Sequence, residues 1–270
     1  MSFTEHNHNG LIFDTADGLS ALGGIRHTFT TRHGGVSPAP FDSLNFADNR
    51  GDAPENLLEN YRRLGEAVGF DGSRVVGCRQ IHSDLVRIAQ EEHAGRILWD
   101  DRPYDADALV TNVPNLPLVV FGSDCCTILL YDTLAHCIGA CHAGWRGTAS
   151  GIALKTAISM MTYYGATPQT MHAAIGPSIG KCCFLTDSDV PEAFAQLLDP
   201  AIDEQIVKVG DKYSIDLKAI NRLWLLRAGM DPKNVEVHPD CTMCHPERYW
   251  SHRLMGDQRG GMIGVISMEG

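Results

Sequence analysis

Short β-rich runs in the middle of the chain constrain its fold more than any other feature. Residues 116–123, 127–132 and 136–142 read LPLVVFGS, TILLYD and HCIGACH, with turn-forming residues between them. Runs of this kind predict strands, and strands so close in sequence commonly pair with each other. Helices predicted elsewhere in the chain are spaced irregularly among such runs. We therefore expect an α+β fold with mixed sheets rather than a doubly wound parallel sheet.

Helix signals support this reading. Residues 53–70 have apolar side chains at helical spacing, with a proline near the start and Gly69 at the end. Residues 148–165 predict one long helix with Thr148 as its cap and Gly165 as its stop. A third helix is expected over residues 217–230. Early strands are expected over residues 5–15 and 23–32, and residues 74–89 alternate like a strand with one irregular point.

The composition predicts a globular protein with one domain over residues 1–270. Hydrophobic residues make up 44% of the 270 positions, and no repeat or low-complexity linker divides them. The net charge is -11, and no dense run of Lys or Arg offers a positive stripe to a phosphate backbone. We therefore expect no nucleic-acid partner.

No targeting signal stands out. The first ten residues, MSFTEHNHNG, lack the basic start and apolar core of a signal peptide. No window approaches the ~18 apolar residues that span a bilayer. We expect a cytoplasmic protein without a membrane partner, and the sequence does not indicate an oligomeric state.

The nine cysteines do not form the framework of a secreted disulfide protein, because their number is odd and their spacings are irregular. Most are expected to be buried thiols. Cys241 and Cys244 form C-x-x-C beside His245, which suits half of a zinc knuckle or a redox pair. Because no second C-x-x-C exists, we do not expect a structural zinc held by four cysteines.

A thiol and an imidazole come together if residues 127–132 and 136–142 form a hairpin. With Thr133 and Leu134 as a two-residue loop, Cys125 faces His142. Cross-strand partners have Cβ atoms ~4.5–5.5 Å apart, close enough to share one zinc ion. A catalytic zinc takes three protein ligands, and we take His82, where a strand pattern breaks, as the third. The same residues also fit a hydrogen-bonded structural histidine and a core thiol.

The residues after His142 favour an anion. Gly144 and Gly147 permit a ligand to approach the backbone, and the helix that follows directs free N–H groups toward an anion. The planar guanidinium of Arg146 suits phosphate. We therefore take Arg146 as a phosphate-binding residue.

Four further polar residues are candidates with a structural alternative for each. Arg32 and Arg253 could bind phosphate or ribose, although an isolated arginine commonly forms a surface salt bridge. Asn45 could bind a hydroxyl or a base edge, or it could cap a turn. Asp124 could handle a proton or hydrogen-bond a histidine ligand.

Several longer stretches resemble one family. QIHS at 80–83, CHAGWRG at 141–147, AAIGPSIGKCCF at 173–184 and DCTMCHPERYWSHR at 240–253 occur in the order of the bacterial laccase-domain family. Residues 29–47 and 105–132 match that family as well, so the resemblance covers nearly the whole chain. Members of the family are known as polyphenol oxidases and as purine nucleoside phosphorylases.

The resemblance implies a layered α/β/β/α fold and a zinc site at His82, Cys125 and His142. It also implies a pocket for a purine nucleoside and phosphate, in which inosine, adenosine or methylthioadenosine is phosphorolysed and adenosine is deaminated. Cys241 becomes a residue of that pocket by the same resemblance. The chain departs from its relatives in two respects. It carries Phe184 and Leu185 where they often have Tyr-Glu, and it has two additional thiols, those of Cys126 and Cys141.

Three other functions remain open from the residues. Copper-dependent oxidation of phenols fits the family's older name, although it normally needs several copper ions and many histidines. Cys125 as nucleophile with His142 as base would make an amide hydrolase without a metal. A metal- or nucleotide-binding module that serves a partner protein is the non-catalytic alternative.

Overall fold

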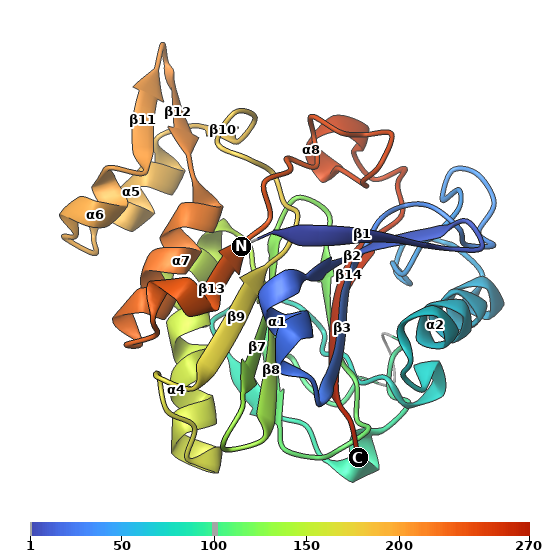
Figure 1. Cartoon of the computed structure of the whole chain (residues 1–270). Helices are drawn as coiled ribbons and strands as arrows, with labels where there is room; N and C mark the ends of the chain where they lie inside the picture. The colour runs from blue at the N-terminus through green and yellow to red at the C-terminus, as the bar shows by residue number, and fades with distance from the viewer. Residues whose placement is uncertain (1, 99–101) are drawn as a thin grey trace.

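Two β-sheets packed face to face form the centre of the molecule (Figure 1). The computed structural model describes residues 2–98 and 102–270. The first sheet has the order β1-β2-β3-β14-β6, and all its neighbouring strands are antiparallel. Its strands are β1 Phe3–His8, β2 Leu11–Ala16, β3 Ile25–Thr30, β14 Met262–Met268 and β6 Leu118–Gly122.

The second sheet has six strands in the order β13-β9-β7-β8-β5-β4. The pairs β13·β9 and β4·β5 are parallel and the others antiparallel, so the sheet is mixed, as the sequence predicted. Its strands are β13 Val235–Val237, β9 Met171–Ile175, β7 Cys126–Asp132, β8 Cys137–Ala143, β5 Ala108–Thr111 and β4 Val86–Ile88.

Helices cover the outer faces of both sheets. The six-stranded sheet carries α4 Ile152–Tyr164 and α7 Leu217–Arg227, and the five-stranded sheet carries α2 Pro54–Val68 (Figure 1). This is the α/β/β/α arrangement expected from the resemblance. Strand β7 is buried along its whole length because Ile128 and Leu130 pack toward the helices while Leu129 and Tyr131 pack between the sheets.

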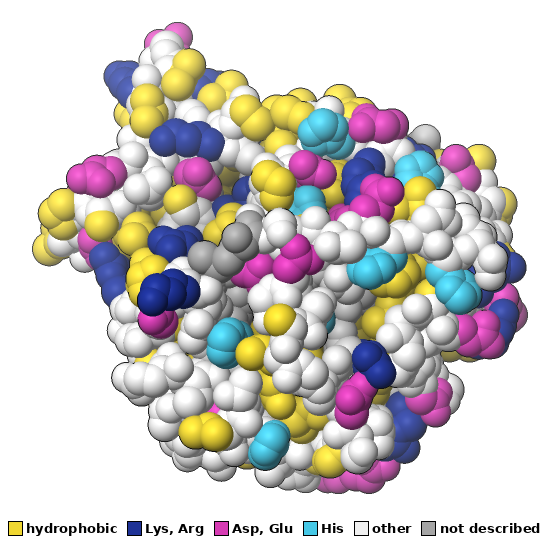
Figure 2. Space-filling model, viewed as in Figure 1, with side chains coloured by type: hydrophobic (Ala, Val, Ile, Leu, Met, Phe, Trp, Pro, Cys, Tyr) yellow, Lys and Arg dark blue, Asp and Glu magenta, His cyan; other side chains and the backbone are white. Residues whose placement is uncertain are grey.

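Smaller elements complete the fold. An arm made of β10 Leu185–Thr186, β11 Ile206–Val209, β12 Lys212–Ile215, α5 Asp189–Ala195 and α6 Pro200–Asp203 projects from the body (Figure 1). Figure 2 shows acidic and basic side chains interspersed over the face in view. The short helices are α1 Asp17–Leu22, α3 Trp145–Ala149 and α8 His252–Met255, with 3₁₀ turns at 72–74, 91–93 and 232–234. Within the described residues, every helix is too short or too polar to cross a bilayer.

Some predicted elements are corrected by the structure. The strand expected over 5–15 is a hairpin, β1 and β2, which turns at Asn9 and Gly10 where both φ angles are positive. The strand expected over 74–89 is reduced to β4 and isolated bridges. The long helix after residue 148 is divided at Gly151, whose φ is +73°, so that Thr148 lies inside α3 instead of capping a helix. The prediction of α2, with Gly69 in the left-handed conformation at its end, is confirmed.

The predicted register of the central hairpin is wrong by two residues. Cys126 pairs with Ala143 and Thr127 with His142, and the loop is the four residues 133–136. The Asp132 carboxylate accepts hydrogen bonds from the backbone N–H groups of Leu134, at 2.9 Å, and of Ala135, at 2.7 Å. These bonds stabilise the longer loop, which explains why a two-residue turn does not form.

A shift of two residues keeps the same side chains on the same face, because side-chain direction alternates along a strand. His142 therefore still points to the side of the sheet on which Cys125 lies. The alternation also turns the extra thiols Cys126 and Cys141 into the core beneath the helices. Burial raises the pKa of Cys126 to about 11, and it raises the pKa of Cys141 further still.

Candidate active site

His82, Cys125 and His142 come together as the resemblance implied. Their ligand atoms all lie within 4.8 Å of one another. His142 is the penultimate residue of β8, Cys125 directly precedes β7, and His82 lies in the loop before β4. His82 adopts a φ of 58°, which breaks the strand and accounts for the irregular point in the sequence pattern.

Asp107, which the sequence analysis missed, orients two of these residues. Its Oδ1 lies 2.8 Å from Nδ1 of His142 and 3.1 Å from the backbone nitrogen of His82. Its Oδ2 accepts hydrogen bonds of 2.6 Å from both the backbone N–H and the hydroxyl of Ser83. Because the carboxylate accepts from Nδ1–H, Nε2 of His142 is left to face Cys125. In the sequence, Asp107 is marked only by its position just before a β-rich run.

The buried carboxylate and the thiol set the protonation behaviour of the site. Burial alone would lower the pKa of His142, but Cys125 and Asp107 raise it to about 9. Burial and the neighbouring His142 lower the pKa of His82. Burial works against ionisation of Asp107, yet His142 and Ser83 hold the pKa of this carboxyl below its ordinary value. The charged form of Asp107 is thus the natural partner of the His142 ring.

Gly144 lets the donor groups approach each other. A Cβ on this residue would lie 2.8 Å from Nδ1 of His82 and 3.1 Å from Sγ of Cys125. Gly144 has a φ of -69°, so the requirement for glycine is one of space and not of backbone conformation. Gly144, which we expected to let a ligand approach the backbone, therefore makes room for the side chains of His82 and Cys125, two candidate metal ligands.

A cavity of about 250 Å³ opens beside the three residues. Three guanidinium groups line it, those of Arg50, Arg102 and Arg259, together with the His252 imidazole. Arg50 pairs with Asp257 at 2.9 Å, and Arg102 pairs with Asp48 at 2.8 Å. The cavity therefore combines soft metal-ligating groups with positive charge.

Arg259 is the most unusual cation in this cavity. It is 7% exposed, and its Nε is buried without a hydrogen-bond partner in the described part of the chain. Burial, reinforced by the nearby Arg50, lowers the pKa of Arg259 to about 10. A buried guanidinium with an unsatisfied N–H gains stabilisation when it contacts an anion. A lone arginine carries no pattern in the sequence, so Arg259 could not be predicted from it.

Arg146, which the sequence predicts to bind phosphate, lies outside this cavity. Arg146 is exposed, and its guanidinium stacks over the Trp145 ring at 4.1 Å instead of lining the cavity. Its charge still contributes to the lowered pKa of His82. Helix α3 is only five residues long, so the extended helix N-terminus that we expected to favour an anion is absent at residues 145–149.

Asp124 and Arg253 hold neighbouring chain segments together beside the site. Asp124 accepts hydrogen bonds from the hydroxyl of Thr242 at 2.6 Å and from the backbone N–H of Arg253 at 2.7 Å. The Arg253 guanidinium donates to the carbonyl of Leu185 at 2.8 Å. The partner of the ligand His142 is thus Asp107 and not Asp124, which corrects one of the two roles considered for Asp124.

Asn45 and Arg32 occupy supporting positions. Asn45 is fully buried, where its Oδ1 accepts from Ala47 and Gly261 N–H groups and its Nδ2 donates to Asp52. Arg32 stacks over Trp250 at 3.8 Å and donates to backbone carbonyl groups at 3.0 and 3.2 Å. Neither lines this cavity, and both hold loops through these contacts, while a contact with substrate stays a prediction.

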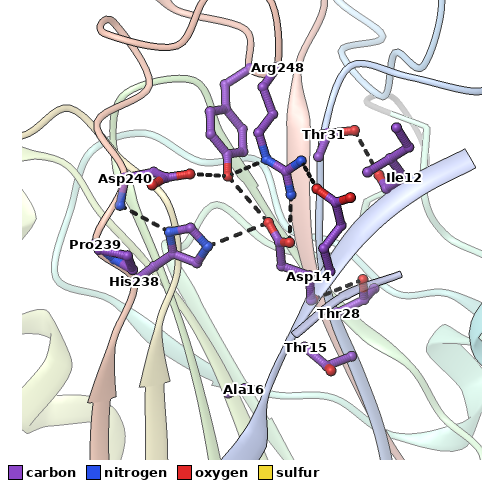
Figure 3. A network of polar contacts seen from close by, with 12 residues as sticks. Ile12, Asp14, Thr15, Ala16, Thr28, Thr31, His238, Pro239, Asp240 and Arg248 are labelled. Carbon is purple, nitrogen blue, oxygen red and sulfur yellow. Dashed lines mark hydrogen bonds and ion pairs between the residues drawn. The ribbon is translucent and has the colours of Figure 1, made fainter. Parts of the chain in front are cut away.

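A buried polar network anchors the segment that leads to His252 (Figure 3). Asp14, on β2, pairs with Arg248 at 2.6 Å and with the ring of His238 at 3.4 Å. The Tyr249 hydroxyl donates to Asp240 at 2.9 Å. Burial opposes ionisation of Asp14, but His238 and Arg248 keep the pKa of its carboxyl below the ordinary value. These contacts fasten residues 238–249 to the five-stranded sheet.

Cys241 lies outside the cavity, in a second cluster. The Sγ atoms of four cysteines lie within 4.8 Å of one another: Cys182, Cys183, Cys241 and Cys244. Burial alone would raise the pKa of Cys241, but backbone N–H groups, first that of Gly180, hold it below its ordinary value. The expectation of no four-cysteine zinc rests on the lack of a second C-x-x-C, but here two adjacent cysteines supply the second pair of thiols.

Comparison with known proteins identifies the family. A model of the family described as multi-copper polyphenol oxidoreductase laccase matches residues 26–269, nearly the whole chain. The chain belongs to this laccase family. The resemblance seen in the short stretches is therefore confirmed over the full fold.

Named members of the laccase family are similar along most of their length. The purine nucleoside phosphorylase YlmD of Geobacillus stearothermophilus is 33% identical over 253 residues, which is 92% of each chain. A purine nucleoside phosphorylase of Deinococcus radiodurans is 34% identical over 258 residues, covering 94% of this chain and 95% of its own. The crystal structure of the Geobacillus protein superposes with a TM-score of 0.91 over 99% of both chains. The relatives thus carry a phosphorylase name within a family named for oxidation.

Proposed function

We propose that this chain is a zinc-dependent purine nucleoside phosphorylase that acts on inosine, adenosine and methylthioadenosine and also deaminates adenosine. The observation that carries the proposal is the cluster of His82, Cys125 and His142 at the wall of a cavity that also holds the buried Arg259. The names of the similar proteins support the same activity. We further propose that residues 1–270 form one catalytic domain that works in the cytoplasm.

The three residues fit zinc by their chemistry. Two imidazoles and one thiolate are ligands that zinc prefers, and three protein ligands are typical of a catalytic zinc. A histidine ligand whose other nitrogen donates to a carboxylate, as His142 does to Asp107, is the usual support for such a metal. When bound, zinc would supply Lewis acidity toward an oxygen of the reactants.

Copper remains the second metal to consider, because the family is named for it. Oxidation of phenols by oxygen normally uses several copper ions and many histidines. Within residues 2–98 and 102–270, one candidate metal group contains histidine, and this group has only two histidines, His82 and His142. We therefore favour zinc and phosphorolysis over copper and oxidation.

Phosphorolysis needs a phosphate held against the sugar. A phosphate oxygen bonds to the anomeric carbon while the bond from that carbon to the purine nitrogen breaks, and the purine leaves with the electron pair and takes a proton. We assign Arg259 to hold the phosphate, since its buried Nε has no hydrogen-bond partner among residues 2–98 and 102–270. We assign His252, which lines the cavity, to deliver the proton to the leaving base.

Deamination would use the same cavity with water in place of phosphate. The water oxygen bonds to the carbon that carries the amino group, and ammonia leaves with the proton. The pKa of His82 is lowered, so its ring is neutral near neutral pH, which is the form that would serve as a metal ligand in both reactions. Both reactions depend on the cavity, and we expect them to be lost together in His142→Ala.

A metal-free hydrolase has one specific observation in its favour. Cys125, His142 and Asp107 follow one another as nucleophile, base and orienting carboxylate do in cysteine hydrolases. The third donor, His82, approaches the same two residues, which a hydrolase does not need and a metal does. A covalent adduct on Cys125 together with full activity after chelation would favour the hydrolase.

The deciding experiment measures turnover of inosine and adenosine, with and without phosphate, on protein of known metal content. Phosphate-dependent release of hypoxanthine and adenine from zinc-loaded protein is the expected result. Full phosphorolysis by metal-free protein would contradict the role of zinc. Oxygen uptake on phenols by the copper-loaded form, with no nucleoside turnover, would favour the oxidase.

A further inference from the structure

The four-cysteine cluster is built by neighbouring parallel strands. Strands β9 and β13 run side by side in the same direction, so the segments that leave their carboxyl ends emerge together. Ser178 and Cys241 form a further parallel bridge beyond the two strands, and the N–H of Thr242 donates to the Ser178 carbonyl at 3.1 Å. Residues 182–183 and 241–244 therefore meet although they are about sixty positions apart.

The sulfur atoms lie at distances that suit one tetrahedral metal ion. Sγ of Cys244 is 3.6 Å from that of Cys182 and 3.4 Å from that of Cys183. Zinc binds cysteine sulfur at ~2.3 Å, and a tetrahedron of that size separates its sulfur atoms by roughly 3.8 Å. Small side-chain adjustments would therefore bring all four sulfur atoms to one ion.

The backbone around Cys241 is shaped for a thiolate. The N–H of Gly180 donates to Sγ of Cys241 at 3.1 Å, and a tight turn joins Cys241 to Cys244 through a 3.1 Å backbone hydrogen bond. A Cβ on Gly180 would lie 3.1 Å from Cβ of Cys241 and 3.2 Å from Sγ of Cys182. Hydrogen bonds of this kind stabilise metal-bound sulfur.

Positive charge accompanies the cluster. Lys218 is buried and donates from Nζ to the carbonyl of Asp240, the residue before Cys241, at 2.9 Å. Four thiolates around a divalent cation carry a net charge of minus two, which a buried lysine nearby partly offsets. Cys182 and Cys244 are exposed, so a metal can enter from solvent.

We infer that Cys182, Cys183, Cys241 and Cys244 bind one zinc ion in a structural site separate from the candidate active site. Four sulfur ligands leave no open position, so this zinc joins chain segments and does not bind substrate. It fastens residues 182–183 to the segment that continues to His252 and the cavity. The inference does not depend on the proposed reaction.

Metal content tests the inference directly. Wild-type protein is expected to hold two zinc ions per chain, while the double variant Cys182→Ser/Cys244→Ser and the variant His142→Ala each hold one. Combining all three changes should remove both ions, and Cys137→Ala, which changes a thiol buried in β8, should keep both. Equal zinc content in the wild type and the double variant would overturn the inference.

Two further experiments, cobalt substitution and thiol labelling, test the inference if the double variant folds poorly, because they leave the four cysteines unchanged. Cobalt bound by His142→Ala protein should give the intense sulfur-to-metal charge-transfer bands of a tetrahedral four-thiolate site. In the same protein, mass spectrometry should find the four thiols protected from iodoacetamide until a chelator is added. Labelling at the same rate with and without the chelator, or a disulfide among the four cysteines, would refute zinc binding here.

Discussion

The Nδ1 atom of His142 lies 2.8 Å from Oδ1 of Asp107, and this carboxylate also accepts N–H groups from the loop that carries His82. One buried side chain therefore orients two candidate metal ligands that are sixty positions apart in sequence. The Asp107 carboxylate also fixes which nitrogen of the His142 ring is free to bind a metal.

Asp107→Asn should weaken zinc binding at the candidate active site by about ten- to a hundredfold, because the neutral amide no longer holds the ring by a charged hydrogen bond. Competition with a chromogenic chelator measures the affinity, and thermal unfolding reports any loss of fold. Asp105→Asn is the matched control, since Asp105 forms an exposed pair with Arg79 at 2.6 Å. Unchanged affinity in Asp107→Asn would contradict the orienting role.

Gly144→Ala should separate the ligands without unfolding the protein. The new methyl group would fall 2.8 Å from Nδ1 of His82 and 3.1 Å from Sγ of Cys125, while the backbone conformation suits alanine. We expect zinc content and nucleoside turnover to fall at least about tenfold. Gly77→Ala serves as control, because its Cβ would meet only side-chain atoms, at 3.3 Å. Normal zinc content in Gly144→Ala would show that the ligands can move apart freely.

Arg259→Met should raise KM for phosphate by about ten- to a hundredfold, the usual loss for one charge-assisted hydrogen bond to an anion. Initial rates at varied phosphate and fixed inosine measure this effect. Arg146→Met is the comparison, because Arg146 is exposed and lies outside the cavity. A larger effect from Arg146→Met would restore the assignment made from sequence.

Acid should destabilise the fold through His27. This residue is 3% exposed, its Nε2 accepts the N–H of Ala16 at 2.9 Å, and burial lowers its pKa to about 4. The unfolded chain, with an ordinary pKa near 6.5, binds the proton more readily between these values. Stability is therefore complete above about pH 6.5 and falls toward pH 4, by about 2 kcal/mol from this residue at pH 5.

Urea unfolding at pH 7.5 and pH 5 measures the effect of His27. His27→Gln keeps an acceptor for the Ala16 N–H but removes the titration, so it should lose less stability between the two pH values than the wild type. An identical loss in both proteins would assign the acid sensitivity to other groups.

The sequence could bring the candidate metal ligands together in spite of a wrong register. The four-residue loop moved the pairing by two positions, and an even shift leaves Cys125 and His142 on one face. A shift by one residue would have separated them. An error in the loop length thus changed which residue lies directly opposite His142, but it did not change which side chains share a face with it.

The supporting residues could not be predicted, for a physical reason. Asp107 acts through contacts to a loop and a strand that only the folded chain brings together. Arg259 is distinguished by burial and by a missing partner, which no spacing reveals. The cysteine cluster escaped detection because parallel strands, and not a local motif, bring Cys183 to Cys244.

The position of β14 bears on how the chain folds. Met262–Met268 lies between β3 and β6 and pairs with both, although more than a hundred residues separate it in sequence from either strand. Until β14 is in place, β3 and β6 each keep an open edge, and the five-stranded sheet lacks the strand that joins its two halves. A folding intermediate without docked β14 therefore exposes two strand edges, which favour pairing with other chains.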